Sequence, residues 1–393
     1  LARRGDRALA VRLVGLDQSG LFEQYWDMIR ATDLESFEAA QRRLQMPMFN
    51  TVYADRDGHI LYLSGGRVPV RPEGGWAEWQ GVMPGTESRT LWTETHPYDD
   101  LPRVVDPPAG WVQNANDPAW TSTFPPALDA DAFPPYLSPR AMGFRPQRSA
   151  RMLAEDSSIT FDELRAYKHD TRLELADRLL DDLLPAARTH GTPLAKQAAE
   201  VLGAWDRRAD ATSRGAVLFA AWAQRLGPGS FAEPWREDAP RTTPDGLADP
   251  AAAATALDAA AREVTDAYGA LDVPWGEVYR LRFGGADLPA NGGPGELGLF
   301  RVLWFAPDDD RRFRAVGGDS YVALVEFSDP VRAEVLTTYG NASQPGSAHR
   351  GDQVELFARQ ELRPVWRTRA EVEANLEGRT AFGPDDGAAY ARN

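Results

Sequence analysis

The chain has 393 residues, of which 43% are hydrophobic and 26% charged, and its net charge is −15. This balance is typical of one large or two ordinary globular domains, and the negative charge disfavours nucleic acid and anionic membranes as partners. The sequence contains no cysteine, which excludes thiol catalysis, disulfide bonds and thiolate metal sites.

The chain begins with Leu1, without an initiator methionine or a signal-peptide pattern. Such a start suggests a chain cut from a longer precursor, or a truncated one.

Residues 11–45 are predicted to form a broken helix, since Leu21, Tyr25, Met28 and Ile29 share one helical face. No apolar run is long enough to predict a membrane span.

A β-hairpin is predicted next, from residues 50–54 and 60–63. The link between them contains Asp57-Gly58, and a glycine there supplies the left-handed residue that a tight turn needs. Residues 66–147 are rich in proline, glycine and tryptophan and lack periodicity. We expect them to form a long, ordered loop, which in a compact protein is usually functional or wrapped over the core.

Helices are predicted to dominate from about residue 150 to 228. Thr160 and Glu163 form a capping-box pattern, and leucines over residues 173–184 form an apolar stripe. Further helices are expected at 195–205, 215–226 and 250–270, strands at 300–305 and 321–327, and a short helix capped by Thr368 and Glu371. The predicted fold class is α+β, with residues 1–150 as a loop-rich core part, 151–285 as a mainly helical part and 286–393 as returning strands and tail.

Familiar catalytic signatures are absent. The sequence has no G-x-S-x-G elbow, no phosphate-binding G-x-x-x-x-G-K-[ST] loop and no H-E-x-x-H helix. The five histidines are scattered without metal-ligand spacing, so we interpret them as surface or structural residues.

Residues 111–120 place Asn114, Asn116 and Asp117-Pro118 between two tryptophans. An asparagine amide is an uncharged N–H donor, which suits an oxyanion hole. The alternative is an Asx-turn before Pro118. Arg145 and Arg148 form a second cluster, which could hold a substrate carboxylate or orient a neighbouring site, or could make surface salt bridges.

Taken in order, residues 50–71, 110–118, 145–164 and 339–365 resemble the β-subunit of penicillin acylases, which are N-terminal-nucleophile hydrolases. The branch that they resemble most contains acyl-homoserine lactone acylases and aculeacin-type acylases. The resemblance implies part of a four-layer αββα sandwich with a helical insertion, in a precursor that cleaves itself. It also implies an N-terminal serine that attacks an amide with its own α-amine as base.

Carried over by motif, Asn116 is the side-chain oxyanion donor, with Asn114 as the alternative, and Arg145 and less securely Arg148 lie near the active site. The substrate is an N-acylated amide: an acyl-homoserine lactone, a penicillin or a lipopeptide. No cofactor is required. Related acylases carry a structural calcium ion, for which Asp129 and Asp131 are the nominees here. The family implies a periplasmic or secreted protein.

One departure from the family pattern is large. The family's serine lies farther upstream of the asparagine loop than this chain extends, and Leu1 cannot replace it. We therefore expect the α-subunit and a serine-bearing N-terminal β segment as partners, and no amidase activity from this chain alone. Two other classes stay open: a tryptophan-rich module that binds carbohydrate or peptide, and a glycoside hydrolase.

Overall fold

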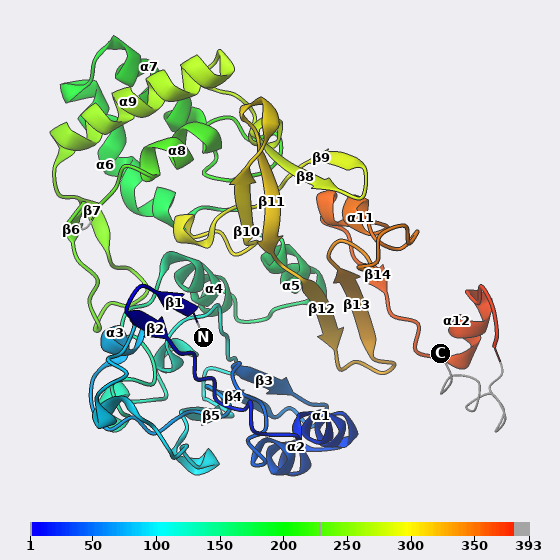
Figure 1. The fold of residues 1–393 in the computed structure, drawn as a ribbon. Coiled ribbons are helices and arrows are strands. Elements are labelled where there is room, and N and C mark those ends of the chain that lie inside the picture. The colour runs from blue at the N-terminus through cyan, green and yellow to red at the C-terminus, as the bar shows by residue number, and fades with distance from the viewer. Residues whose placement is uncertain (1, 228, 381–393) are drawn as a thin grey trace.

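A computed structural model describes residues 2–227 and 229–380, which combine helices with five small sheets (Figure 1). This mixture confirms the α+β class. The helices are α1 (Leu21–Arg30), α2 (Leu34–Gln41), α3 (Trp76–Trp79), α4 (Phe144–Ala154), α5 (Phe161–Lys168), α6 (Glu174–His190), α7 (Pro193–Ala204), α8 (Ala216–Ala223), α9 (Pro250–Tyr268), α10 (Trp275–Val278), α11 (Val354–Ala358) and α12 (Arg369–Ala374). In this part of the chain, no helix is both long and apolar enough to cross a bilayer.

The largest sheet has the order β10-β11-β8-β9, and two three-stranded sheets have the orders β3-β4-β5 and β12-β13-β14. Two further pairs, β1-β2 and β6-β7, are isolated hairpin-like ladders. The strands are β1 (Ala2–Arg4), β2 (Arg7–Leu9), β3 (Thr51–Ala54), β4 (Ile60–Leu63), β5 (Arg103–Val105), β6 (Phe231–Glu233), β7 (Asp245–Leu247), β8 (Tyr279–Phe283), β9 (Ala286–Pro289), β10 (Leu303–Pro307), β11 (Phe313–Gly318), β12 (Tyr321–Glu326), β13 (Arg332–Thr337) and β14 (Arg363–Pro364).

The main hydrophobic core joins the helices α6 to α9 to the largest sheet. Figure 1 shows these helices gathered at one end of the molecule beside β10 and β11. Leu179 and Leu183 of α6, Trp222 of α8 and Leu257 of α9 are fully buried there. Because such apolar stripes recur every three to four residues, each helix buries one face and the four stabilise one another.

A second part of the molecule is built on the sheet β3-β4-β5. Leu61 and Leu63 of β4 pack into one small core with Tyr98, while Tyr62 faces the other side and packs against Trp120. The residues between β4 and α4 contain α3, β5 and several single helical turns rather than long elements. The long ordered loop of the sequence prediction is therefore confirmed, with β5 as an unpredicted third strand.

Several other sequence predictions are confirmed. The hairpin forms as β3 and β4, with Gly58 at φ +92 in its link. Both capping boxes form, at Thr160 with Glu163 and at Thr368 with Glu371. The predicted helices in the middle of the chain correspond to α6, α7, α8 and α9.

Other predictions need correction. The helices begin before residue 150, because Arg145 and Arg148 already lie within α4, which precedes the helix capped by Thr160. A proline in the first turn of α4 is compatible with helical geometry, because the backbone N–H groups there have no intrahelical partner. The strand predicted at residues 300–305 begins later, at Leu303.

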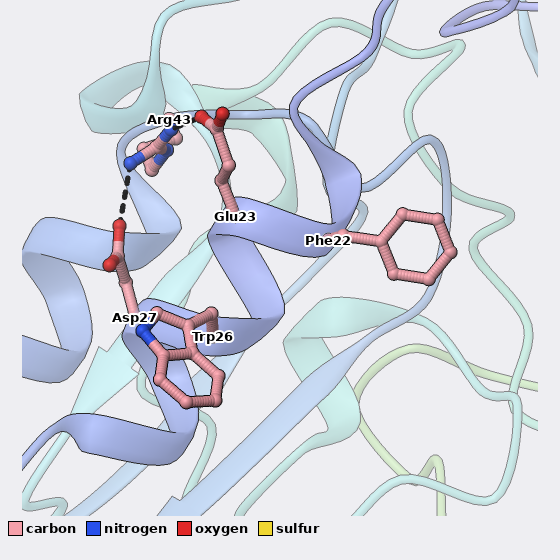
Figure 2. Close-up of a pocket in the computed structure, with 5 residues that line it drawn as sticks. All are labelled: Phe22, Glu23, Trp26, Asp27 and Arg43. Carbon is pink, nitrogen blue, oxygen red and sulfur yellow. Dashed lines mark hydrogen bonds and ion pairs between the residues drawn. The ribbon is translucent and has the colours of Figure 1, made fainter. Parts of the chain in front are cut away.

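The helix α1 buries only part of the predicted face, since Leu21 and Met28 are half-buried whereas Tyr25 and Ile29 are exposed. Gln24 is its buried residue, whereas Phe22, Trp26 and Ile29 are 85%, 59% and 77% exposed. Figure 2 shows Glu23 and Asp27 turned toward Arg43 while Phe22 points away from it. The solvent-facing side of α1 is therefore largely apolar.

Candidate active site

The loop of residues 111–118 is organised around the buried carboxylate of Asp117. Its Oδ1 accepts a hydrogen bond from the backbone N–H of Ala115 at 2.8 Å. Its Oδ2 accepts from Nε2 of Gln113 at 2.8 Å and from the hydroxyl of Thr121 at 2.5 Å. Burial raises the pKa of Asp117, although these hydrogen bonds act in the opposite direction. The carboxylate thereby fixes the path of the backbone on both sides of Asn116.

Asn114 closes a turn within the same loop. Its Oδ1 accepts from the backbone N–H of Asn116 and from Nδ2 of Asn50, both at 3.0 Å. Its Nδ2 donates to the carbonyl of Asp117 at 3.2 Å. The Asx-turn weighed from the sequence is therefore present. Because this amide is engaged at both ends, Asn114 has little capacity left to donate to a ligand.

Asn116 is exposed and stands at the tip of the turn with φ +63, in the left-handed region that asparagine tolerates better than most residues. Its Oδ1 accepts a hydrogen bond from Nη2 of Arg145 at 2.5 Å. Guanidinium groups donate and never accept, so the atom facing Arg145 must be the amide oxygen. The amide nitrogen is consequently the end of the side chain that is free to donate.

Arg145 reaches Asn116 from α4. Burial lowers the pKa of its guanidinium, and the carboxylates of Asp117, Asp319 and Glu296 oppose that shift. Its side chain lies against Gly295, where an added Cβ would come within 3.1 Å of Nε and 3.2 Å of Cδ. The single helical turn Gly295–Leu297 therefore lies along this arginine.

Arg148 has a different environment, although it lies one turn along α4. Its Nε and Nη2 donate to the two carboxylate oxygens of Asp170 at 2.8 and 3.2 Å. Asp170 is buried and also accepts from Arg208 at 3.3 Å. Arg148 thus joins α4 to the start of α6, and its guanidinium faces the protein interior instead of the loop.

The aspartates nominated for calcium also bind protein groups. Asp129 caps the backbone N–H of Asp131 at 2.9 Å, and Asp131 forms an ion pair with Arg140. Across residues 2–227 and 229–380, no group of three or more His, Asp or Glu side chains could hold a metal ion. The calcium site nominated at these two aspartates stays a prediction.

Among the described residues, the histidines do not form a catalytic pair with a nucleophile. His59 pairs with Asp106 and His349 with Asp352, both at exposed positions, while His96 contacts Tyr136 and His169 contacts Arg301. Within the described residues, no histidine is hydrogen-bonded to a serine hydroxyl. The arrangement thus supplies an amide donor and its positioning groups but no histidine-activated nucleophile.

The tryptophans do not assemble into one aromatic surface. Trp120, Trp205, Trp222 and Trp275 are buried in the cores. The exposed ones come from separate segments: Trp26, Trp76, Trp304 and Trp366. Near the candidate site, Trp111 packs against Phe124 with a centroid separation of 6.4 Å. This pattern gives no support to a tryptophan-rich binding platform.

Asp117, Asn50 and Gly295 are the site residues that the sequence analysis missed. Only Asp117 carried a signal, because an aspartate before proline in a tryptophan-rich loop favours a turn. Asn50 and Gly295 lie far from the loop in sequence, and no local pattern could have joined them to it.

The comparisons with known proteins bear on the same segments. The penicillin amidase family model matches residues 2–374. An acyl-homoserine lactone acylase of Pseudomonas putida is 29% identical, over 95% of this chain and 51% of its own length. The aculeacin-A acylase of Actinoplanes utahensis is 26% identical, over 94% of this chain and 52% of its own length. The chain thus spans about half the length of these curated relatives.

Among solved structures, the thermostable penicillin G acylase of Alcaligenes faecalis matches with a TM-score of 0.59 at 17% sequence identity. The match covers 92% of this chain and 72% of that one. The chain therefore shares its fold with this penicillin G acylase, as the sequence analysis predicted.

Proposed function

The chain belongs to the penicillin amidase family, and we propose that it is the C-terminal part of an amidohydrolase that cleaves linear amides of N-acylated substrates. Since the chain spans about half the length of its relatives, the nucleophilic serine belongs to a segment outside residues 1–393. In this proposal the chain contributes the oxyanion donor and the groups that position it.

The hydrogen bond from Arg145 to Asn116 is the observation that supports the proposal most directly. It engages the amide oxygen of Asn116, so that Nδ2 is the end of the amide that can donate to a substrate. Asparagine donates without a permanent charge, and its dipole is oriented before any substrate arrives. Such preorganised donors are effective because no reorganisation is needed when charge develops.

The proposed reaction has two steps. The serine hydroxyl attacks the acyl carbonyl while the α-amine of the same residue accepts the hydroxyl proton. The carbonyl oxygen becomes negative and accepts a hydrogen bond from Nδ2 of Asn116. Collapse of this intermediate breaks the C–N bond, and the α-amine passes its proton to the leaving amine. Water then attacks the acyl-enzyme by the same route and releases the acid.

For the substrate we propose an amide with an apolar acyl group: an acyl-homoserine lactone, a penicillin or a lipopeptide. The names of the relatives include an acyl-homoserine lactone acylase, an aculeacin-A acylase and a penicillin acylase 2 proenzyme. Trp111 and Phe124, packed beside the loop, are candidates for one apolar wall of an acyl pocket.

The proposal is tested on the full gene product. It should release a carboxylic acid from N-acyl substrates and gain the mass of one acyl group, on a serine outside this chain, when treated with a serine-directed acylating reagent. Asn116→Ala should lower turnover by roughly 10²–10³. The matched control is Asn375→Ala, since Asn375 follows α12 and makes only a helix-end contact. No acid from any substrate and no serine adduct would exclude the amidase.

A further inference from the structure

A row of three side chains leads away from the loop that carries Asn116. Trp111 lies in that loop, and its ring centroid is 6.4 Å from the centroid of Phe124. The guanidinium carbon of Arg241 lies over the Phe124 ring, 5.0 Å from its centroid. All three side chains are half-buried. The row therefore connects the candidate site to a positive charge from a distant part of the sequence.

Arg241 comes from the connection between β6 and β7, which Figure 1 shows descending from the helical end of the molecule toward its lower half. The fully buried Gln147 of α4 holds the backbone of this connection. Its Nε2 donates to the carbonyls of Pro240 at 3.0 Å and of Thr243 at 2.7 Å. Arg178 of α6 donates to the carbonyl of Arg241 itself at 2.5 Å. Because the backbone is fixed on both sides of Arg241, its side chain loses less freedom when it binds a ligand.

The charge of Arg241 has no counter-charge nearby, since in the described part of the chain this residue forms no ion pair. Glu233, Glu237 and Asp238 of the same connection are each paired with another arginine. A half-buried charge is stabilised when an opposite charge meets it. A guanidinium can donate two parallel hydrogen bonds to a carboxylate. The position of Arg241 therefore suits a ligand that carries a carboxylate.

We propose that Arg241 selects the acyl group of the substrate, and that this group is an apolar chain with a carboxylate at its far end. The assignment rests on the proposed function and narrows its substrate class. The methylene groups pack along Trp111 and Phe124, while the terminal carboxylate accepts hydrogen bonds from Arg241. The reaction is the same amide hydrolysis. Water is consumed, the C–N bond breaks, a C–O bond forms, and the products are a dicarboxylic acid and an amine.

Arg145 and Arg241 have different tasks, although α4 positions both. Arg145 contacts the amide oxygen of Asn116, so it acts on the oxyanion donor. Gln147, two residues later in α4, holds the connection that carries Arg241. The rings of Trp111 and Phe124 separate Arg241 from the rest of the loop. Arg241 is therefore a specificity residue that touches the distant end of the acyl group and takes no part in the bond changes.

Two substrates that differ only at the end of the acyl chain test this role on the full gene product. They are the adipoyl and hexanoyl amides of one chromogenic aniline, and the wild type should have the higher kcat/KM for the adipoyl amide. Arg241→Gln should lower that kcat/KM by about 10- to 100-fold, because it removes a hydrogen bond between charged groups. The loss should appear in KM, since the contact is the same before and during the reaction. For the hexanoyl amide, kcat/KM should stay within about twofold of the wild-type value.

Two further variants serve as a reversal and as a control. Arg241→Glu puts a negative charge where the carboxylate binds, so it should reverse the preference between the two amides. Arg236→Gln changes an exposed arginine of the same connection that is already paired with Glu233 and Asp238, and it should leave both substrates unaffected. The carbonyl of residue 241 still accepts from Arg178 in every variant. The thermal unfolding midpoints should therefore stay unchanged.

Isothermal titration with the two acids gives a measurement that needs no turnover. Adipate should bind the wild type at least about tenfold more tightly than hexanoate, and Arg241→Gln should remove the difference. An equal loss for both amides in Arg241→Gln would make the residue merely structural and overturn its assignment. Equal binding of the two acids by the wild type would do the same. The proposed function fails separately: no acid release from either amide would disprove the amidase, while adipate binding that depends on Arg241 would keep the carboxylate site.

Discussion

Replacement of Arg145 by methionine removes the group that orients the Asn116 amide while it keeps most of the side chain's volume. The lost contact is a hydrogen bond to a charged donor, worth about 1.5–3 kcal/mol. Without it the amide can rotate and present its oxygen to the substrate. Since each 1.36 kcal/mol in the barrier is tenfold in rate, kcat should fall by about 10- to 150-fold. The loss should not exceed that of Asn116→Ala, because Arg145 acts through Asn116.

The assay is a double-mutant cycle on the full gene product, with acid release measured at saturating and at limiting substrate. If Arg145 only positions Asn116, the variant that carries both substitutions should be no slower than Asn116→Ala alone. Arg188→Met, on the exposed side of α6, is the matched control. The reasoning is refuted if Arg145→Met keeps the wild-type kcat, or if the two losses multiply in the double variant.

Three further predictions concern the stability of the chain itself. Asp170→Asn removes the charge of the buried carboxylate that pairs with Arg148, so urea unfolding should show a loss of about 3–5 kcal/mol. Burial, reinforced by nearby positive charges, lowers the pKa of His169 to about 3 from 6.5. The unfolded chain therefore binds a proton that the folded chain excludes, so stability should fall as the pH drops below 6.5 and His169→Gln should flatten that part of the curve. Gly298→Ala should cost about 1–3 kcal/mol or more, because φ is +88 and the new Cβ would lie 2.6 Å from that of Glu174.

Matched control variants show whether these losses of stability come from the named contacts or would follow any substitution of the same type. Asp238 is an exposed partner of Arg236, so Asp238→Asn should leave the urea midpoint nearly unchanged. Gly85 has no heavy atom within 4 Å of an added Cβ, and Gly85→Ala should be tolerated. Equal midpoints for Asp170→Asn and Asp238→Asn would show that the buried ion pair adds no stability. An unaltered pH slope in His169→Gln would exclude that residue as the titrating group.

Local sequence signals predicted the local structure well. The Asp57-Gly58 link, the Thr160 capping box and the leucine stripe of α6 each depend on neighbours within a few residues. Non-local pairing was harder to predict. The strand β8 is short and mixed in character, and it enters the sheet through parallel pairing with β11, thirty-odd residues later. No periodicity marks such a partner, and loop length alone does not exclude other orders.

The same contrast holds for the candidate site, whose residue types could be predicted and whose long-range contacts could not. The resemblance to the family supplied Asn116 and Arg145, and the structure brings these two residues into contact. The resemblance could not show that Arg148 forms an ion pair with Asp170. An arginine that binds substrate and an arginine that stabilises the fold are the same residue type, so the sequence does not distinguish them. The resemblance also could not show that the amide of Asn114 is hydrogen-bonded to Asn50 and to the backbone of the turn.

The left-handed backbone at Asn116 limits what evolution can place there. Glycine and aspartate also adopt φ near +63 at low cost, but neither preserves the donor. Glycine lacks a side chain, and an aspartate would pair with Arg145 and present only acceptors. Asparagine thus meets the demands of backbone and chemistry together at low cost. Surviving variation in active relatives should therefore fall on the supports of this residue rather than on the residue itself.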